Sequence, residues 1–250
     1  MRTVDVGNSS VSVGVWEGDR CRVTRCADLE QAVSLLGASA VGIAVSGPRW
    51  EALQAALVAA GSEPVRRLQG VPRTLALAAP SLAGSAGSDR LAAALAVGPG
   101  PAVVVDAGTA VTVDIVDGAG AYCGGFIAPG PAAGLAGLAR ATEALPDLPA
   151  KAVDLVPGLE TQGALSAGAW GLAVGGVDRL VQAALESLSE AAGRQAPARE
   201  SAAGSRCVEL WATGGWGAAW AAASRLEGAE AIQVDPALVH RGVAAWAALP

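Results

Sequence analysis

A strand-and-turn pattern that occurs twice constrains this chain more than any other feature. Val4-Asp5-Val6-Gly7-Asn8-Ser9 is echoed, about 100 residues later, by Val105-Asp106-Ala107-Gly108-Thr109-Ala110. In both copies a strand leads into Asp-x-Gly and a small polar residue, and an alternating apolar strand follows. A unit that is repeated in matched context indicates a duplicated sheet domain. We therefore expect two similar domains, 1–100 and 101–250, with a cleft between them.

The rest of the chain alternates between strand-like and helix-like runs, which predicts an α/β fold with mixed sheets flanked by helices. Hydrophobic residues make up 52% of the 250 residues and charged residues 16%, so a substantial core can be buried. After a hairpin at residues 4–15, strands are expected at 20–25, 41–45, 63–67, 102–105, 111–116, 122–127, 208–211 and 232–234. Helices are expected at 29–36, 50–60, 132–142, 164–190, from 217 and at the end of the sequence.

Residue counts exclude several classes of function. The net charge of −6 and the absence of a basic stripe argue against nucleic acid as a partner. The one lysine is Lys151, so the phosphate-binding loop that ends in Gly-Lys-Ser/Thr is absent. The one histidine, His240, has no Gly-x-Ser-x-Gly elbow to accompany it and is expected to be structural. The four cysteines form no Cys-x-x-Cys pair, which disfavours a zinc site.

A membrane or export role is also disfavoured. The longest uncharged stretch, residues 118–139, is broken by Gly124-Gly125 and by Pro129-Gly130-Pro131, which a lipid-exposed helix does not tolerate. The first residues place Asp5 where a signal peptide has its apolar run. We therefore expect a soluble, cytoplasmic protein with no membrane partner.

An Asp-x-Gly turn between two strands has a chemical use. Glycine lets the backbone approach a phosphate closely, and the neighbouring N–H groups and hydroxyl donate to its oxygens. The carboxylate can hold Mg²⁺ directly or through water. Taken singly, each copy is better explained as an ordinary hairpin turn, in which Asp, Gly and Asn are favoured. Two copies in matched context favour phosphate binding.

Five short motifs follow one another in a specific order. They are Asp5-Val6-Gly7-Asn8-Ser9, Gly87-Ser88-Asp89-Arg90, Asp106-Ala107-Gly108-Thr109-Ala110, Gly124-Gly125-Phe126-Ile127-Ala128-Pro129-Gly130 and Thr161-Gln162-Gly163-Ala164. Their order and spacing resemble type III pantothenate kinase, the Bvg accessory factor family. That family belongs to the superfamily of acetate and sugar kinases and actin, whose two domains are ribonuclease H-like. A later Gly214-Gly215, after an expected strand, matches the superfamily's adenosine contact.

The resemblance implies that both hairpins serve ATP. It places Asp5 near Mg²⁺ and a monovalent cation, K⁺ or NH₄⁺, at Asp106. The residues that it assigns to ATP are Asp5, Val6, Gly7, Asn8, Ser9, Ser10, Val11, Ser12 and Thr109. It implies the phosphorylation of pantothenate to 4'-phosphopantothenate, the first step of coenzyme A biosynthesis, by a homodimer.

The resemblance assigns pantothenate to Gly87, Ser88, Asp89, Arg90 and Thr161, with Asp89 taking the proton of the attacking hydroxyl. The residue types suit this chemistry without the family. A carboxylate can accept a hydroxyl proton during phosphoryl transfer, and a guanidinium suits the carboxylate of a substrate. The same four residues at 87–90 also fit a plain helix start with Ser88 as N-cap.

Departures from the family keep two alternatives open. A tyrosine that the family has about nine residues before the base is missing near Pro80, and the only tyrosine is Tyr122. One alternative is another small-molecule kinase of the superfamily, although a sugar needs no arginine beside the base. The other is a catalytically silent regulatory protein on the same fold. The intact Asp5, Asp89 and Asp106 argue against this second alternative.

Overall fold

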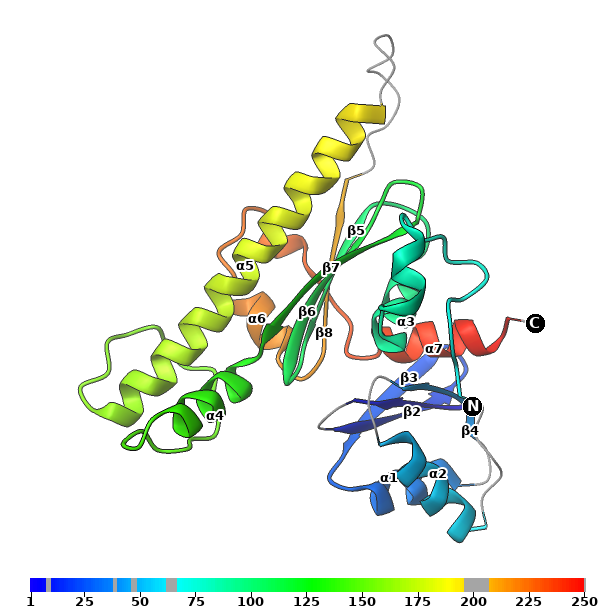
Figure 1. Ribbon diagram of the computed structural model, residues 1–250, viewed down its shortest axis with the longest axis horizontal. Helices are drawn as coiled ribbons and strands as arrows, with labels where there is room; N and C mark the ends of the chain where they lie inside the picture. The colour runs from blue at the N-terminus through cyan, green and yellow to red at the C-terminus, as the bar shows by residue number, and fades with distance from the viewer. Residues whose placement is uncertain (8–9, 38–39, 46–48, 62–66, 196–206, 250) are drawn as a thin grey trace. The chain divides into compact units, whose positions relative to one another are not determined.

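The computed structural model describes residues 1–7, 10–37, 40–45, 49–61, 67–195 and 207–249, with backbone only at 40–45 and 193–195 (Figure 1). Its strands are β1 (Arg2–Val6), β2 (Val11–Glu17), β3 (Arg20–Cys26), β4 (Ala40–Val45), β5 (Ala102–Ala107), β6 (Ala110–Val116), β7 (Tyr122–Pro129), β8 (Glu209–Thr213) and β9 (Gln233–Val234). Its helices are α1 (Leu29–Leu36), α2 (Trp50–Ala59), α3 (Ser88–Val97), α4 (Pro131–Ala141), α5 (Thr161–Gln195), α6 (Gly217–Ala223) and α7 (Leu238–Ala247), with 3₁₀ turns η2 (Pro80–Gly84) and η3 (Ala229–Ala231).

The expected elements are found with end points shifted by a few residues, because hydrophobic periodicity is a local signal. The expected strand at 63–67 lies almost wholly outside the described residues. No helix in the described part of the chain is long and apolar enough to cross a membrane.

The residues form two compact units that do not follow the order of the chain. The first unit comprises Met1–Gly100, Val116–Gly124 and Asp235–Pro250, and the second comprises Pro101–Ile115 and Gly125–Val234. Helix α7 therefore belongs with the first unit, although the whole second unit precedes it in the sequence. The division into domains 1–100 and 101–250 remains a prediction.

The two sheets have the same order over four strands, and the second sheet has a fifth strand, β9, at its edge. The first is ordered β3-β2-β1-β4 and the second β7-β6-β5-β8-β9. Strand β1 is antiparallel to β2 and parallel to β4, and β5 is parallel to β8. Only two residues connect β5 to β6, which requires an antiparallel pair. Each Asp-x-Gly turn thus lies at the same place in its sheet, which confirms the expected pair of similar mixed α/β sheets.

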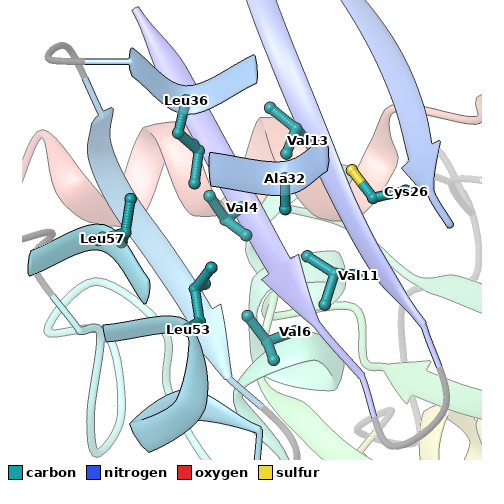
Figure 2. Close-up of a cluster of buried hydrophobic side chains, with 9 residues drawn as sticks. All are labelled: Val4, Val6, Val11, Val13, Cys26, Ala32, Leu36, Leu53 and Leu57. Atoms are coloured by element: carbon teal, nitrogen blue, oxygen red, sulfur yellow. The ribbon is translucent and has the colours of Figure 1, made fainter. Parts of the chain in front are cut away.

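Alternation along β1 and β2 gives the first sheet two different faces. Val4, Val6, Val11 and Val13 point to one face, where they are buried against α1 and α2 side chains that include Leu36 and Leu53 (Figure 2). Because successive side chains of a strand point to opposite faces, Thr3 and Asp5 lie on the other face. Ser12 and Gly14 share that second face, since they pair with Asp5 and Thr3 across the two strands. Helix α7 packs against this polar face of β1.

Candidate active site

The first hairpin places its predicted ATP-binding residues in two distinct environments. The N–H of Gly7 donates to the carbonyl of Ser10 over 2.9 Å and closes the turn. Asn8 and Ser9, also predicted to bind ATP, lie outside the described residues. Val6 and Val11 are buried in the apolar core, so only their backbone is available to a ligand. Asp5 and Ser12 are half-buried and form a cross-strand pair on the polar face.

A buried hydrogen-bond chain braces this hairpin. His240 of α7 lies with its Nε2 3.0 Å from Ser12 Oγ and its Nδ1 3.0 Å from Thr3 Oγ1. The indole N–H of Trp16 donates to the same Thr3 oxygen over 3.0 Å. Burial lowers the pKa of His240 from 6.5 to about 4, so the imidazole is neutral at physiological pH. Ser12 and His240 are 228 positions apart, so no local sequence pattern indicates this contact.

The predicted base lies in the first turn of α3. The helix has Gly87 as its N-cap and Ser88 as its first residue, so the reading of Ser88 as N-cap is wrong. Asp89 Oδ1 folds back over Gly87 so closely that a Cβ there would clash with it. Among the described residues, this buried oxygen has no hydrogen-bond partner. A buried acceptor that lacks a donor is costly, and a substrate hydroxyl would supply one.

Arg90, the residue after the predicted base, contacts Tyr122, to which no role was assigned from the sequence. The Arg90 guanidinium carbon lies 5.9 Å from the centre of the Tyr122 ring, within the range of a cation–π contact. Tyr122 is fully buried. Its backbone N–H donates to Ala76 over 2.9 Å, and its carbonyl accepts from Ala78 over 3.0 Å. Tyr122 therefore contacts Arg90, and its burial leaves no ring surface for a substrate.

In the second unit, three motifs converge on the Asp106 turn. The N–H of Gly108 donates to Ala110 over 3.0 Å, much as Gly7 donates to Ser10 in the first hairpin. A Cβ on Gly130, which follows β7, would clash with the carbonyls of Gly108 and Thr109. Gly214, which follows β8 and has φ +81°, is also closely packed. A Cβ there would clash with Asp106 Oδ1 and with the Ala107 carbonyl. The structure thus brings the second Asp-x-Gly turn together with the motif at 124–130 and with the later glycine pair.

The chemistry of this turn suits a cation. The Asp106 carboxylate and the Ala107 carbonyl oxygen both lie next to Gly214. A side chain at position 214 would fill the space beside these two oxygens. Oxygen ligands of this kind are those that hard cations take. In the described part of the chain, no group of three or more His, Cys, Asp or Glu side chains could hold a metal by itself. The Asp5 carboxylate is likewise an oxygen ligand that fits an Mg²⁺ ion arriving with a nucleotide.

Thr161, the last predicted pantothenate contact, is the first residue of α5. It lines a cavity of about 840 Å³ between the end of β7, α4 and α5, and most of its other lining residues are apolar. Thr161 therefore lies in the second unit with Asp106 and Thr109, whereas Asp5, Ser12, Asp89 and Arg90 lie in the first.

Two mixed sheets share the same order over four strands, and in each an Asp-x-Gly turn joins that sheet's first two strands along the chain. This arrangement is the actin-like fold of the acetate and sugar kinases. Two solved structures share this fold. A Baf family protein from Campylobacter jejuni superimposes with a TM-score of 0.59 at 23% identity, over 98% of this chain and 96% of the other. A protein from Sinorhizobium meliloti described as a 2-dehydro-3-deoxygalactonokinase gives a TM-score of 0.50 at 17% identity, over 98% and 97%.

The sequence comparisons narrow the class. The family model of type III pantothenate kinase matches residues 2–183. The type III pantothenate kinase of Dehalococcoides mccartyi (strain 195) is 31% identical over 210 residues, which are 72% of this chain and 78% of the relative. That of Rhodospirillum centenum is 44% identical over 90 residues, 34% of each chain. The chain belongs to the type III pantothenate kinase family, and the predicted resemblance is confirmed. Membership makes it a kinase that uses ATP with Mg²⁺.

Proposed function

We propose that this chain transfers the γ-phosphoryl group of ATP to the hydroxyl of pantothenate, giving 4'-phosphopantothenate, the first step of coenzyme A biosynthesis. The observation that carries the proposal is the buried Asp89 Oδ1, which has no hydrogen-bond partner among the described residues and adjoins Arg90. An unpartnered carboxylate oxygen beside a guanidinium suits a substrate with a hydroxyl to deprotonate and a carboxylate to anchor. Family membership supplies the substrate class.

In this proposal the first unit carries the proton transfer. Asp89 accepts the proton of the pantothenate hydroxyl as that oxygen attacks the γ-phosphorus, and ADP leaves. Arg90, held against Tyr122, pairs with the pantothenate carboxylate. Gly87 and Ser88 contact pantothenate beside it, and the absence of a side chain at 87 leaves room for the Asp89 carboxylate as it lies. The first hairpin, with the Ser12 hydroxyl, binds the ATP phosphates. Mg²⁺ bound with ATP near Asp5 neutralises charge on those phosphates.

The second unit carries the remaining residues of the proposal. Asp106 holds K⁺ or NH₄⁺, Thr109 contacts ATP, and Thr161, which lines the cavity, contacts pantothenate. A homodimer is part of the proposal. It is supported by exposed apolar side chains on α5 and on the segment before it, namely Leu155, Val156, Leu159 and Leu172. Burying such side chains against a second copy is favourable.

The test is a coupled assay of ADP release from Mg·ATP, with and without pantothenate. We expect release that depends on pantothenate, and Asp89→Asn is expected to lower kcat by roughly 10²- to 10⁴-fold. Glu51→Gln is the matched control, because Glu51 is also a first-turn acid in the first unit but is exposed. A wild-type chain whose ADP release ignores pantothenate would overturn the proposal, and a fully active Asp89→Asn variant would remove Asp89 from it.

A further inference from the structure

Helix α7 contributes a single buried polar side chain to the face of the first sheet that carries Asp5 and Ser12. His240 is only 2% exposed, and the hydroxyls of Thr3 and Ser12 flank its two ring nitrogens. Next to it, the Arg241 guanidinium lies 5.9 Å from the Trp16 ring and is bound to Asp235 over 2.6 Å. The helix is therefore tied to β1 and β2 at two consecutive residues.

Strands β1 and β2 leave space for the His240 side chain at Gly14. Gly14 faces His240 from β2, and a Cβ on Gly14 would lie 2.6 Å from Thr3 Oγ1, 2.8 Å from His240 Nδ1 and 2.9 Å from Cys21 Sγ. Side-chain atoms do not approach a Cβ this closely without displacement. Any side chain at position 14 would therefore force at least one of these three side chains, His240 among them, to move.

Only one assignment of donors and acceptors satisfies both the buried Thr3 hydroxyl and the buried His240 imidazole. The Trp16 indole only donates, so Thr3 Oγ1 accepts from it. Thr3 is fully buried, and its own proton finds an acceptor among the described residues only in Nδ1 of His240. A neutral imidazole that accepts at Nδ1 carries its proton on Nε2 and donates it to Ser12. Ser12 Oγ then accepts from the histidine, and its own proton is left to donate to a ligand.

The same helix is packed against the helix that carries Asp89. A Cβ on Gly242 of α7 would clash with the backbone carbonyl of Ala92 in α3. His240 and Gly242 lie two residues apart, so α7 contacts the Ser12 hairpin and the Asp89 helix within one turn. Both contacts lie within the first unit.

We infer that His240 is a positioning residue for nucleotide binding: through Nε2–H it fixes the Ser12 hydroxyl so that this group donates to a phosphate oxygen of Mg·ATP. The inference rests on the proposed function for the identity of the ligand. His240 touches no substrate and forms no bond in the reaction. Loss of its Nε2–H would weaken Mg·ATP binding and leave proton transfer at Asp89 intact.

Two substitutions separate the two ring nitrogens. Glutamine places an amide N–H near Nε2, and asparagine places an amide oxygen near Nδ1. We expect His240→Asn to raise the KM for Mg·ATP roughly three- to tenfold, the worth of one hydrogen bond, with kcat changed less than about twofold. His240→Gln should keep a KM near that of the wild type. In Ser12→Ala, His240→Asn should add little further effect, because both changes break the same contact. Equal KM values in folded His240→Asn, His240→Gln and wild-type protein would overturn the inference.

A second measurement needs neither a variant nor catalysis. His240 is the only histidine, so the imidazole nitrogens of ¹⁵N-histidine-labelled protein give one assignable pair of signals. We expect the Nε2–H form, and a shift of the Nε2 signal when Mg·ADP is added. A proton on Nδ1, or signals indifferent to saturating Mg·ADP, would overturn the inference.

The two proposals fail differently. If the wild type binds Mg·ADP and shifts the Nε2 signal but releases no ADP in response to pantothenate, the proposed function fails and the positioning role stands. If pantothenate-dependent ADP release is normal and the His240 signals do not respond to nucleotide, the positioning role fails alone. A wild-type chain that binds no nucleotide overturns both.

Discussion

The two Asp-x-Gly hairpins occupy the same place in their sheets and are braced by different kinds of contact. The first is held by side chains, through Trp16, Thr3, His240 and Ser12. The second is held by backbone, because Gly130 and Gly214 bring other strand ends directly against its carbonyl oxygens. One repeated unit has thus been stabilised by polar hydrogen bonds in one copy and by close packing in the other. Substitution, pH and solvent should therefore affect the two hairpins differently.

The largest expected difference concerns ions. We expect Asp5→Asn and Asp106→Asn each to lower kcat/KM by roughly 10²- to 10³-fold, because in the proposed function each carboxylate binds a cation that serves ATP. Only Asp5→Asn should raise the Mg²⁺ concentration that half-saturates the rate. Only Asp106→Asn should abolish a preference for K⁺ or NH₄⁺ over Na⁺. Rates measured across both ion series check this, and a wild type that is indifferent to Na⁺ or K⁺ would contradict the cation at Asp106.

Acid should weaken the first hairpin selectively. His240 has a pKa of about 4 in the folded protein and 6.5 when unfolded, so the unfolded state binds more protons between these values. Stability is therefore lost as the pH falls from about 6.5 through 4, by roughly 3 kcal/mol from this group. The thiol of the neighbouring Cys21 does not titrate there, since burial raises its pKa to about 11.

Urea unfolding at several pH values measures this effect. The difference in unfolding free energy between wild type and His240→Gln should shrink as the pH falls, because glutamine does not titrate. A constant difference from pH 7 to pH 4 would contradict a buried, neutral His240.

Added volume should weaken the second hairpin selectively. Gly130→Ala forces a methyl group onto the carbonyls of Gly108 and Thr109, which is expected to cost roughly 2–3 kcal/mol of unfolding free energy. Gly134→Ala, one turn further along in α4, is the matched control, because a Cβ there meets nothing within 4 Å. That control should be stabilised by roughly 0.5–1 kcal/mol through helix propensity. Equal unfolding midpoints for the two variants would refute the close packing.

The smallest effect compares two indole hydrogen bonds. Trp16→Phe removes the indole N–H that donates to the fully buried Thr3 hydroxyl oxygen and should cost about 1 kcal/mol. Trp211→Phe removes the bond to the exposed Glu209 carboxylate in the second sheet and should cost less than about 0.5 kcal/mol. Paired urea titrations measure both, and the reverse order would contradict the proposed hydrogen-bond chain.

The sequence predicted those parts of the molecule that depend on near neighbours. The helix at 29–36 and the strands around both Asp-x-Gly turns follow from hydrophobic periodicity, which is set by local backbone geometry. The contact between Ser12 and His240 spans 228 positions, and no local pattern encodes it. The pairing of Arg90 with Tyr122 was missed for the same reason. Ser88 was wrongly predicted as the N-cap because serine is a favoured residue type at that position. In the structure the N-cap is Gly87, and the Asp89 carboxylate lies over it.

The late position of α7 in the sequence has a consequence for the order of folding on the ribosome. The apolar face of the first sheet can close against α1 and α2 as soon as the first 60 or so residues have emerged, since domains fold as their chain becomes available. The polar face has to wait for residues 238–247, which are made after the entire second unit. A nascent chain would therefore have a first hairpin whose Ser12 hydroxyl is not yet oriented. If Ser12 binds nucleotide as proposed, nucleotide affinity should appear late in synthesis, when His240 takes its place beside Gly14.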